Sequence, residues 1–322
     1  MILNPSTNQN KVLSADPILK WAGGKRQLIE QFKPLFPRLV LGMDDKNGVK
    51  ECLDVYCEPF TGGGAVFFNF LFAGTEKVFL NDINEELINV MRIVKDGYSL
   101  EYLLGELKNM ENTEEFFYQT RNLDRDKEKY KTIPSFKKAS RILYLNKTCF
   151  NGLYRVNRKG EFNVPFGKYK KPNIVNEDGL RKAHEYLSAM DVQLSSMDFC
   201  EIIDKMIAMK KENHALKIFV YLDPPYIPVS ETASFTSYAK DSFSMEDQIQ
   251  LWEKCNQLDE NGILFMLSNS EHSFIYEYYG EKSKEHGRLF NIQTVTAGRA
   301  INSKGDGRGK VKEVVVRNYN TP

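Results

Sequence analysis

The sequence predicts an α/β protein with a doubly wound, mainly parallel sheet whose chain is interrupted by a helical, basic insertion. Three observations support this prediction. A strand, a glycine turn, a helix and a second strand follow one another from about residue 53. The α/β alternation stops at about residue 98 and returns at about residue 191. From about Ser99 to Asn146 the pattern is helical and dense in charge, and the segment that follows has no steady period, which separates this region from the sheet.

The first α/β segment divides into short elements. "RQLIEQFKPL" predicts a helix from about Arg26 to Leu35, and "LDVYCEPF" predicts a strand that runs into the turn "TGGG". "AVFFNFLFAG" predicts a buried helix closed by Gly74, and "KVFLNDI" predicts the second strand. "NEELINVMRIVKDG" predicts a helix capped by Asn84 and Gly97.

Strands and helices alternate again after the insertion. "VQLSSMDF" predicts a strand, "CEIIDKMIAMKK" a helix and "KIFVYLDPPY" a strand. "MEDQIQLWEKCNQLDENG" predicts a helix, "ILFMLSN" a strand, and "LFNIQTVTA" and "EVVVRNY" the closing strands. We therefore expect residues 1–97 and 191–322 to form the α/β domain and residues 98–190 to form the insertion.

Charge is balanced over the whole chain but not along it. The formal net charge of +1 excludes a global attraction to polyanions, so a nucleic-acid surface must be a local patch. Such a patch is predicted from Lys137 to Lys171, where ten Lys or Arg accompany one acidic residue, Glu161. A solvated face is the alternative. The interleaved aromatic residues Phe150, Tyr154, Phe162, Phe166 and Tyr169 favour nucleic acid.

The cysteines and apolar runs argue against several classes of protein. The five cysteines are scattered without a CxxC pair, which disfavours a disulfide framework or a zinc site and favours a reducing cytoplasm. No run approaches 18 apolar residues, so no membrane span is expected. The first residues lack the basic and apolar regions of a signal peptide.

The glycine turn and a later acid suggest a nucleoside ligand. Glycine lets the backbone turn sharply, and Asp82 ends the next strand twenty positions after Gly62. That spacing places a carboxylate beside ribose hydroxyls in sheets of this kind. The dinucleotide pattern G-x-G-x-x-G/A is not met, because Phe67 follows Gly62 and Gly64. An adenosine without a pyrophosphate, as in S-adenosylmethionine, suits the turn. A tight turn without a ligand, with Asp82 as a helix N-terminal charge, is the alternative.

An earlier glycine pair carries basic and aromatic residues. In "LKWAGGKRQL", Lys25 stands at a helix start, where it could meet a carboxylate such as the methionine end of that cofactor. A helix C-cap and a turn with solvated lysines is the alternative.

The tetrapeptide "DPPY" follows a buried strand, where α/β sheets bind ligands. Asp223 can accept a hydrogen bond from an exocyclic amino group. The prolines have no N–H and fix φ, so a neighbouring carbonyl can be aimed as a second acceptor. Tyr226 can stack on a planar ring. These properties fit the amino group of a nucleobase, and a Pro-Pro turn with a chance tyrosine is the alternative.

Taken in order, "LKWAGGK", "EPFTGGG", "LND" and "DPPY" resemble the Dam-type group of DNA adenine-N6 methyltransferases. In that group a target-recognition insert lies between the cofactor motif and the catalytic motif. The resemblance runs from about Leu19 to Tyr319 and includes "CFNGLYRVNRKGEFNVPFGKYKKP", which is similar to the group's DNA-reading segment. It implies a Rossmann-like S-adenosylmethionine-dependent methyltransferase sheet, with residues 98–190 as the DNA-binding domain.

The resemblance also implies the site residues. An adenine flipped out of the duplex would be held by Asp223, Pro224, Pro225 and Tyr226, without a metal or a covalent intermediate. The cofactor would contact Trp21, Lys25, Phe60, Gly62, Gly64, Asp82, Asp198, Phe199 and Asp223. For Asp198 and Phe199, a surface turn is the alternative.

The same resemblance assigns the DNA contacts. Phe150 stands where the group has a tyrosine that wedges into the duplex, so stacking is kept and a hydroxyl contact is lost. Arg155 would read a guanine, Lys20 the outer guanine, and Leu153 or Pro165 a thymine methyl group. Asn151 matches a base-facing position, and Lys170 is expected at a phosphate. Together these residues predict GATC, or a longer site containing GAT, in double-stranded DNA. The protein is expected to be monomeric in solution, and its oligomeric state on DNA is open.

Two alternatives remain open at this point. The same acceptor geometry suits amino methylation of cytosine N4, of RNA or of a glutamine amide. A catalytically dead DNA-binding module is the second. It is also open whether the protein belongs to a restriction–modification system or acts as a solitary methylase.

Overall fold

The computed structural model describes residues 2–3, 12–13, 15–21, 23–41, 52–69, 75–228, 243–298 and 310–321. The main sheet has seven strands in the order β5-β4-β3-β6-β7-β9-β8. The chain forms two compact units. Unit 1 comprises Met1–Gly24, Gly62–Asn69 and Asp82–Ser196, and unit 2 comprises Lys25–Thr61, Phe70–Asn81 and Met197–Pro322.

Unit 2 contains six strands of the sheet. They are β3 (Val55–Glu58), β4 (Lys77–Asn81), β6 (Ile218–Leu222), β7 (Leu264–Ser270), β8 (Asn291–Gly298) and β9 (Lys310–Arg317). β4, β3, β6 and β7 are parallel, whereas β9 is antiparallel to both β7 and β8. The chain leaves β3 toward β4 on one side, and β6 lies on the other side. The topological switch point is therefore between β3 and β6.

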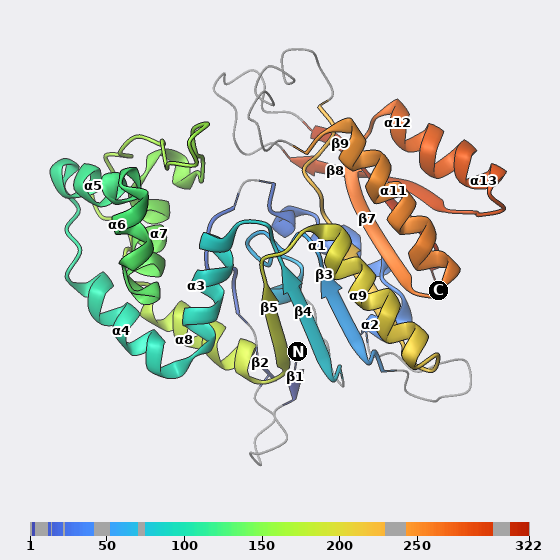
Figure 1. Cartoon of the computed structure of the whole chain (residues 1–322), viewed down its shortest axis with the longest axis horizontal. Coiled ribbons are helices and arrows are strands. Elements are labelled where there is room, and N and C mark those ends of the chain that lie inside the picture. Colours follow the sequence, from blue (N-terminus) through green and yellow to red (C-terminus); the bar gives the residue numbers. More distant parts are fainter. Residues whose placement is uncertain are drawn as a thin grey trace. The chain divides into compact units, whose positions relative to one another are not determined.

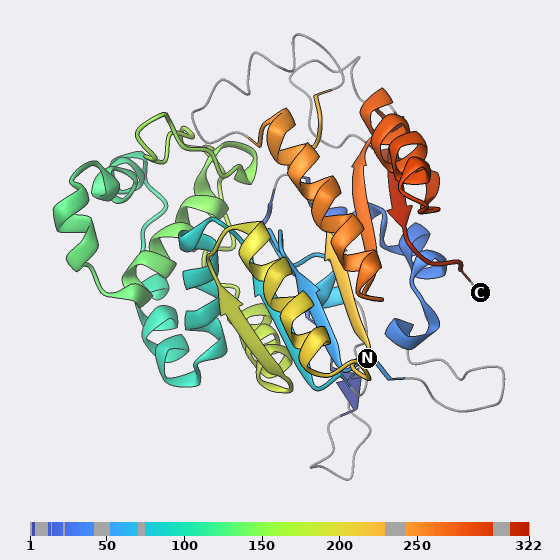
Figure 2. The same cartoon turned by 45° about the vertical axis from the view of Figure 1, so that its right-hand side comes forward.

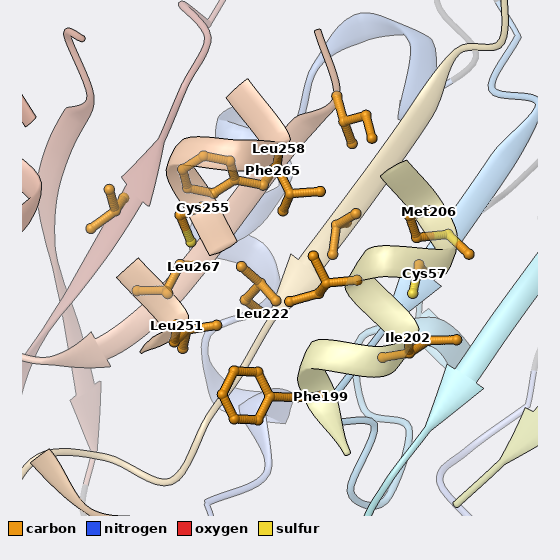
Figure 3. Close-up of a cluster of buried hydrophobic side chains, with 14 of the residues drawn as sticks. Cys57, Phe199, Ile202, Met206, Leu222, Leu251, Cys255, Leu258, Phe265 and Leu267 are labelled. Atoms are coloured by element: carbon orange, nitrogen blue, oxygen red, sulfur yellow. The ribbon is translucent and has the colours of Figure 1, made fainter. Parts of the chain in front are cut away.

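Two helices cover one face of these strands. α9 (Phe199–Glu212) and α11 (Met245–Glu260) lie side by side across them (Figures 1 and 2). Figure 3 shows the buried side chains beneath them, among them Cys57, Leu222 and Leu267. Because successive side chains along a strand point to opposite faces of the sheet, the strand residues next to these point away from α9 and α11. There Phe219 packs against Phe36, with 5.5 Å between ring centroids.

Shorter helices complete unit 2. They are η1 (Lys25–Gln27), α1 (Ile29–Phe32), η2 (Lys33–Leu35), α2 (Arg38–Leu41), α12 (Ser273–Ile275), the π-helix η6 (Tyr276–Lys282) and α13 (Ser283–Glu285). The single helix predicted for Arg26–Leu35 is thus divided. Pro34 has no N–H to donate to Glu30, so the α-helix ends at Phe32 and a 3-10 turn follows.

Unit 1 is mainly helical, and its helices between residues 97 and 148 lie where the sequence pattern predicts helices. Its helices are η3 (Phe67–Asn69), α3 (Glu85–Lys95), α4 (Gly97–Lys108), α5 (Glu114–Arg121), η4 (Asn122–Arg125), α6 (Lys127–Thr132), α7 (Ser135–Thr148), η5 (Phe150–Gly152) and α8 (Glu177–Ser188). Its strands are β1 (Ile2–Leu3), β2 (Val12–Leu13) and β5 (Asp191–Ser195). The segment after α7 is irregular and is joined by the bridges Cys149↔Phe166 and Val156↔Phe162.

Caps determine where α3 begins and ends. The Asn84 side chain accepts hydrogen bonds from the backbone N–H groups of Glu86 and Leu87, so the predicted N-cap is confirmed. The predicted C-terminal role of Gly97 is wrong. Asp96 ends α3 and, through its carboxylate, caps α4, whose first residue is Gly97.

Two further predictions differ from the structure. "AVFFNFLFAG" is predicted as a helix, but its described part contains a turn and the 3-10 helix η3, and Gly74 lies outside the described residues. The strand predicted for "VQLSSMDF" ends at Ser195, because Asp198 accepts a hydrogen bond from the N–H of Cys200 and caps α9. The other predicted strands are confirmed. None of the helices in the described ranges is long and apolar enough to cross a membrane.

Leu267→Ala should lower the free energy of unfolding, because the side chain on β7 is fully buried in the core of unit 2. We expect a loss of about 2–5 kcal/mol in urea unfolding. Leu289→Ala is the matched control, since Leu289 is 77% exposed, and it should change stability by less than about 0.5 kcal/mol. Equal losses in both variants would contradict this placement of the core.

Candidate functional site

A buried carboxylate holds the turn that follows β3. Glu58 Oε1 accepts a hydrogen bond from the Tyr56 hydroxyl at 2.6 Å, and Oε2 accepts one from the Thr61 hydroxyl at 2.8 Å. Both oxygens of this 2%-exposed side chain are therefore satisfied. The backbone from the end of β3 to the glycine turn is restrained as a result.

Asn81, the last residue of β4, joins two loops of unit 2. Its Nδ2 donates to the carbonyls of Pro59 and Met197, each at 3.0 Å, and its Oδ1 accepts from the N–H of Met197 at 3.0 Å. The buried amide thus ties the loop after β3 to the segment that enters α9. The sequence motif "LND" includes this residue, but the sequence pattern assigns the function of that motif to the neighbouring Asp82.

In unit 1, Asp82 binds the backbone of the glycine turn. Its Oδ2 accepts from the N–H of Gly62 at 2.9 Å, and its Oδ1 accepts from the N–H of Asn84 at 2.9 Å. Burial raises the pKa of the Asp82 carboxyl above its usual value, and these two backbone N–H groups oppose the rise. A carboxylate has about four lone-pair positions, so each oxygen can accept a further hydrogen bond from a ligand hydroxyl.

The glycine turn is packed against Trp21. Gly62 has φ +50°, and a Cβ there would lie 3.0 Å from Trp21 Cδ1. Glycine is therefore required by the turn and by the close approach of the indole. The indole also stacks on Tyr154, with ring centroids 5.0 Å apart. Trp21, Gly62 and Asp82 thus belong to one local structure in unit 1, together with Gly64 at φ +71°.

In unit 2, the "DPPY" loop begins with a buried ion pair. Lys25 Nζ lies 2.9 Å from Asp223 Oδ1, and the side chains are 5% and 20% exposed. The same ammonium lies over the Tyr226 ring, 4.4 Å from its centroid. Burial raises the pKa of Asp223 to about 6, Lys25 opposes this rise, and the charge of Glu313 adds to it. Lys25 thus contacts the predicted amine-binding residues, a pairing that the sequence pattern does not anticipate.

Three polar side chains fix the backbone of the same loop. Gln248 Nε2 donates to the carbonyl of Pro225 at 2.9 Å. Asn269 Oδ1 accepts from the N–H of Ile227 at 3.1 Å, and Ser270 Oγ donates to the carbonyl of Ile227 at 2.7 Å. The loop is therefore rigidly attached to α11 and β7. Sequence reasoning missed these residues, because they are polar residues in a helix and strand that the pattern places in the core.

Phe60 belongs to an aromatic cluster in unit 2. Its ring centroid lies 5.4 Å from that of Phe199 and 5.6 Å from that of Phe243. Phe199 is buried at the start of α9, whereas the exposed Asp198 caps that helix. The family resemblance implies that Phe60 and Phe199 contact one ligand, and in the structure these two rings lie together. Phe243 was missed.

Lys20 and the segment after α7 are held together in unit 1. Asn146 Oδ1 accepts from the N–H of Lys20 at 2.9 Å, while its Nδ2 donates to the carbonyls of Lys20 and Gly152 at 2.8 and 3.0 Å. A Cβ on Gly152 would lie 2.9 Å from Lys20 Cδ. Glycine at this position, with φ +63°, therefore lets the Lys20 side chain lie against the loop.

A pocket of about 280 Å³ is formed there, and three lysines are among its lining residues: Lys20, Asn146, Lys147, Asn151, Gly152, Tyr169, Lys171 and Pro172. Two residues predicted to contact DNA, Lys20 and Asn151, line this pocket. Asn151 has φ +57°, and its N–H donates to the Tyr169 hydroxyl at 3.0 Å. Phe150, beside it, is 53% exposed although it is apolar.

The other predicted DNA contacts lie on the same irregular segment. Arg155 is exposed and its Nε donates to Asn163 Oδ1 at 2.7 Å. Pro165 and Lys170 are exposed, and Leu153 is half-buried. Of the five interleaved aromatic residues, Phe162 is instead buried, at 2% exposure.

One member of the predicted basic patch is structural. Arg141 is 2% exposed, and its Nη2 lies 2.6 Å from Asp124 Oδ2. That oxygen also accepts from the N–H of Phe162 at 2.7 Å. Arg141 thus holds the irregular segment against the helices. Because its side chain is buried, it cannot contact a polyanion.

No group of three or more His, Cys, Asp or Glu side chains is arranged to hold a metal ion within the described ranges. Of the carboxylates, Asp82 accepts hydrogen bonds from backbone N–H groups, Asp223 pairs with the ammonium group of Lys25, and Glu313 accepts a hydrogen bond from the Tyr226 hydroxyl. The local chemistry at Asp223 is that of hydrogen-bond acceptance next to an aromatic ring.

Comparison with known proteins gives consistent matches over most of the chain. A family model described as D12 class N6 adenine-specific DNA methyltransferase matches residues 21–301. The type II methyltransferase M1.LlaDCHI of Lactococcus lactis subsp. cremoris is 39% identical over 313 residues, covering 97% of this chain and 98% of that protein. The type II methyltransferase M.MjaIII of Methanocaldococcus jannaschii is 38% identical, covering 95% and 100%. The DNA adenine methylase of Escherichia coli K12 is 36% identical, covering 92% and 93%.

Asn81→Ala should destabilise the protein, because buried backbone groups of Pro59 and Met197 lose their partner. We expect the free energy of unfolding to fall by at least about 1–3 kcal/mol, the cost of one unsatisfied buried group. Asn109→Ala is the control, since Asn109 makes an exposed bond to Gly105, and it should cost less than about 0.5 kcal/mol. If the two variants unfold at the same urea concentration, the hydrogen bonds of Asn81 do not stabilise these loops.

Proposed function

We propose, because the chain belongs to the D12 class of N6 adenine-specific DNA methyltransferases, that it transfers a methyl group from S-adenosylmethionine to an adenine flipped out of double-stranded DNA. The observation that carries the proposal is the Asp223 carboxylate at the end of β6, buried beside Lys25 and next to the Tyr226 ring. An acceptor and a stacking surface at a switch point suit the amino group of a planar base.

In this mechanism the loop after β6 orients the amine. The Asp223 carboxylate and the carbonyl of Pro224 accept the two hydrogens of adenine N6, since the Pro225 carbonyl is already bonded to Gln248. Accepting both hydrogens makes the nitrogen lone pair available for attack. Tyr226 stacks on the base and replaces the neighbours that it lost from the duplex. The departing proton leaves to solvent after transfer.

The cofactor supplies an activated sulfonium methyl group, so the residues around it bind and orient rather than activate. We assign its contacts to Trp21, Phe60, Gly62, Gly64, Asp82, Asp198, Phe199 and Asp223. These residues suit the cofactor. The Asp82 oxygens can accept further hydrogen bonds from ribose hydroxyls, and the Phe60 ring can pack on an adenine. Lys25 contacts Asp223, so we assign it to the target-base site rather than to the cofactor carboxylate.

For target recognition we propose GATC, or a longer site that contains GAT. Arg155 would contact guanine through its two Nη groups, because Nε already donates to Asn163. Lys20 would read the outer guanine from the basic pocket, next to Asn151. The exposed Phe150 would wedge into the duplex, with Leu153 or Pro165 on a thymine methyl group and Lys170 on a phosphate.

The test is methyl transfer from labelled S-adenosylmethionine to duplexes with and without GATC, followed by nucleoside analysis. N6-methyladenine should appear in the GATC duplex, and Asp223→Ala should abolish it while calorimetry still detects cofactor binding. N4-methylcytosine, methylated RNA or methylated glutamine as the product would overturn the proposal. Absence of transfer to every adenine-containing duplex would indicate a DNA-binding module without catalysis.

The rate of transfer should fall as the pH drops through about 6, because Asp223 must be a carboxylate to accept from the amine and burial raises its pKa to about 6. Below that pH the rate constant should fall about tenfold per pH unit in single-turnover experiments. The rate falls toward low pH, rather than rising, because the carboxylate is the active form of Asp223. Asp223→Asn keeps an acceptor oxygen that does not titrate, so its rate should be lower but lack this limb. An unchanged acid limb in Asp223→Asn would assign the limb to another group.

Arg155→Ala should relax the preference for guanine at one position, since a bidentate contact is worth about 1–3 kcal/mol of discrimination. Transfer rates on GATC and on duplexes with that guanine replaced measure the change. Lys170→Ala is the comparison, because a lost phosphate contact should weaken all duplexes alike. A uniform loss for Arg155→Ala would place Arg155 at the DNA backbone instead.

A further inference from the structure

Glu313 reaches the "DPPY" loop from the far end of the sequence. It lies on β9, which runs antiparallel to β7, and it is paired in register with Ser270, the last residue of β7. β7 in turn pairs with β6. An early residue of β9 is thereby placed at the edge of the sheet where the parallel strands end. Its Oε2 accepts a hydrogen bond from the Tyr226 hydroxyl at 2.6 Å.

The contacts of Tyr226 restrain both its edge and one of its faces. The hydroxyl at the ring edge is bonded to Glu313, and the ammonium of Lys25 lies over the ring at 4.4 Å from the centroid. A base that stacks on Tyr226 must therefore use the face opposite Lys25. The orientation of that face decides where the amino group of the base lies relative to Asp223.

We propose that Glu313 is a positioning residue for methyl transfer: its carboxylate holds the Tyr226 hydroxyl, so that the ring face opposite Lys25 is presented to the target base at a fixed angle to Asp223. This inference rests on the proposed roles of Tyr226 and Asp223 and adds a residue to that site. The hydrogen bond is of the short, charge-assisted kind, which is about twice as strong as a neutral one.

Glu313 also acts on Asp223 through its charge. Asp223 is near two charged groups, Lys25 and Glu313, and two tyrosines, Tyr221 and Tyr226. The carboxylate of Glu313 disfavours the charge on Asp223, whereas Lys25 favours it. Removal of the Glu313 charge should therefore shift the acid limb of the rate profile to lower pH. That shift reports the charge of Glu313, whereas the hydrogen bond to Tyr226 is tested by the rate constant.

The test compares Glu313→Ala and Glu313→Gln with wild type in single-turnover transfer to a GATC duplex. Glu313→Ala should lower the rate constant by about 10–100-fold, the range expected when a reacting group is misplaced by up to about 1 Å. Glu313→Gln keeps an acceptor oxygen and the side-chain shape, so it should lose less rate while its acid limb moves to lower pH. The dissociation constant for S-adenosylmethionine should not change in either variant.

Tyr226→Phe provides the decisive comparison, because it removes the hydroxyl that Glu313 holds. In the Tyr226→Phe background, Glu313→Ala should change the rate constant by less than about threefold, since coupled residues are not additive. Glu271→Gln is the control, because Glu271 likewise accepts from a tyrosine, Tyr276, but at an exposed position. It should transfer methyl groups at the wild-type rate.

Wild-type rates in Glu313→Ala, or an equally large loss in the Tyr226→Phe background, would overturn the inference. Tyr226→Ala separates this failure from failure of the proposed function. Impaired transfer in Tyr226→Ala with normal transfer in Glu313→Ala would reject the role of Glu313 alone. Full transfer in Tyr226→Ala would reject the base-stacking role itself.

Discussion

Parallel pairing of β3 with β6 is the constraint on which the target-base site depends. With Val55 opposite Ile218, the two strands run in the same direction and end at the same edge of the sheet. The chain continues from β3 to β4 on one side and from β6 to β7 on the other, so the two loops diverge at that edge. An acid placed directly after β6 is therefore at a position where a ligand can approach.

Buried polar side chains, rather than apolar contacts, determine how the loops at this edge lie. Apolar packing is non-directional, so it stabilises the strands and helices without specifying a loop conformation. Asn81, Gln248 and Asn269 each make hydrogen bonds to loop backbone, and these bonds have defined lengths and directions. The "DPPY" loop is thus held in place before a substrate arrives, which reduces the cost of organising the site.

The ion pair of Lys25 with Asp223 shows the balance that such a site requires. Burial alone would keep the Asp223 carboxyl protonated to a higher pH than in water. A protonated acid is a poorer hydrogen-bond acceptor for an amine. Lys25 opposes that effect, while Glu313 adds to it and holds the Tyr226 hydroxyl. Removing any one of these groups changes both the charge and the geometry around the acceptor.

Local patterns in the sequence determined most of the α/β elements, the helices between residues 97 and 148, the N-cap of α3 and the ordered motifs that place the chain in its methyltransferase family. These features depend on residues a few positions apart, so periodicity and short motifs contain them. Only the tertiary structure decided that Lys25 contacts Asp223, that Glu313 holds Tyr226 across 87 positions, and that Asn146 holds Lys20 across 126. It also decided that Arg141 is buried in an ion pair with Asp124 and is not part of the exposed basic patch. The reason is that strand pairing and burial select these partners, and neither is visible in the local sequence.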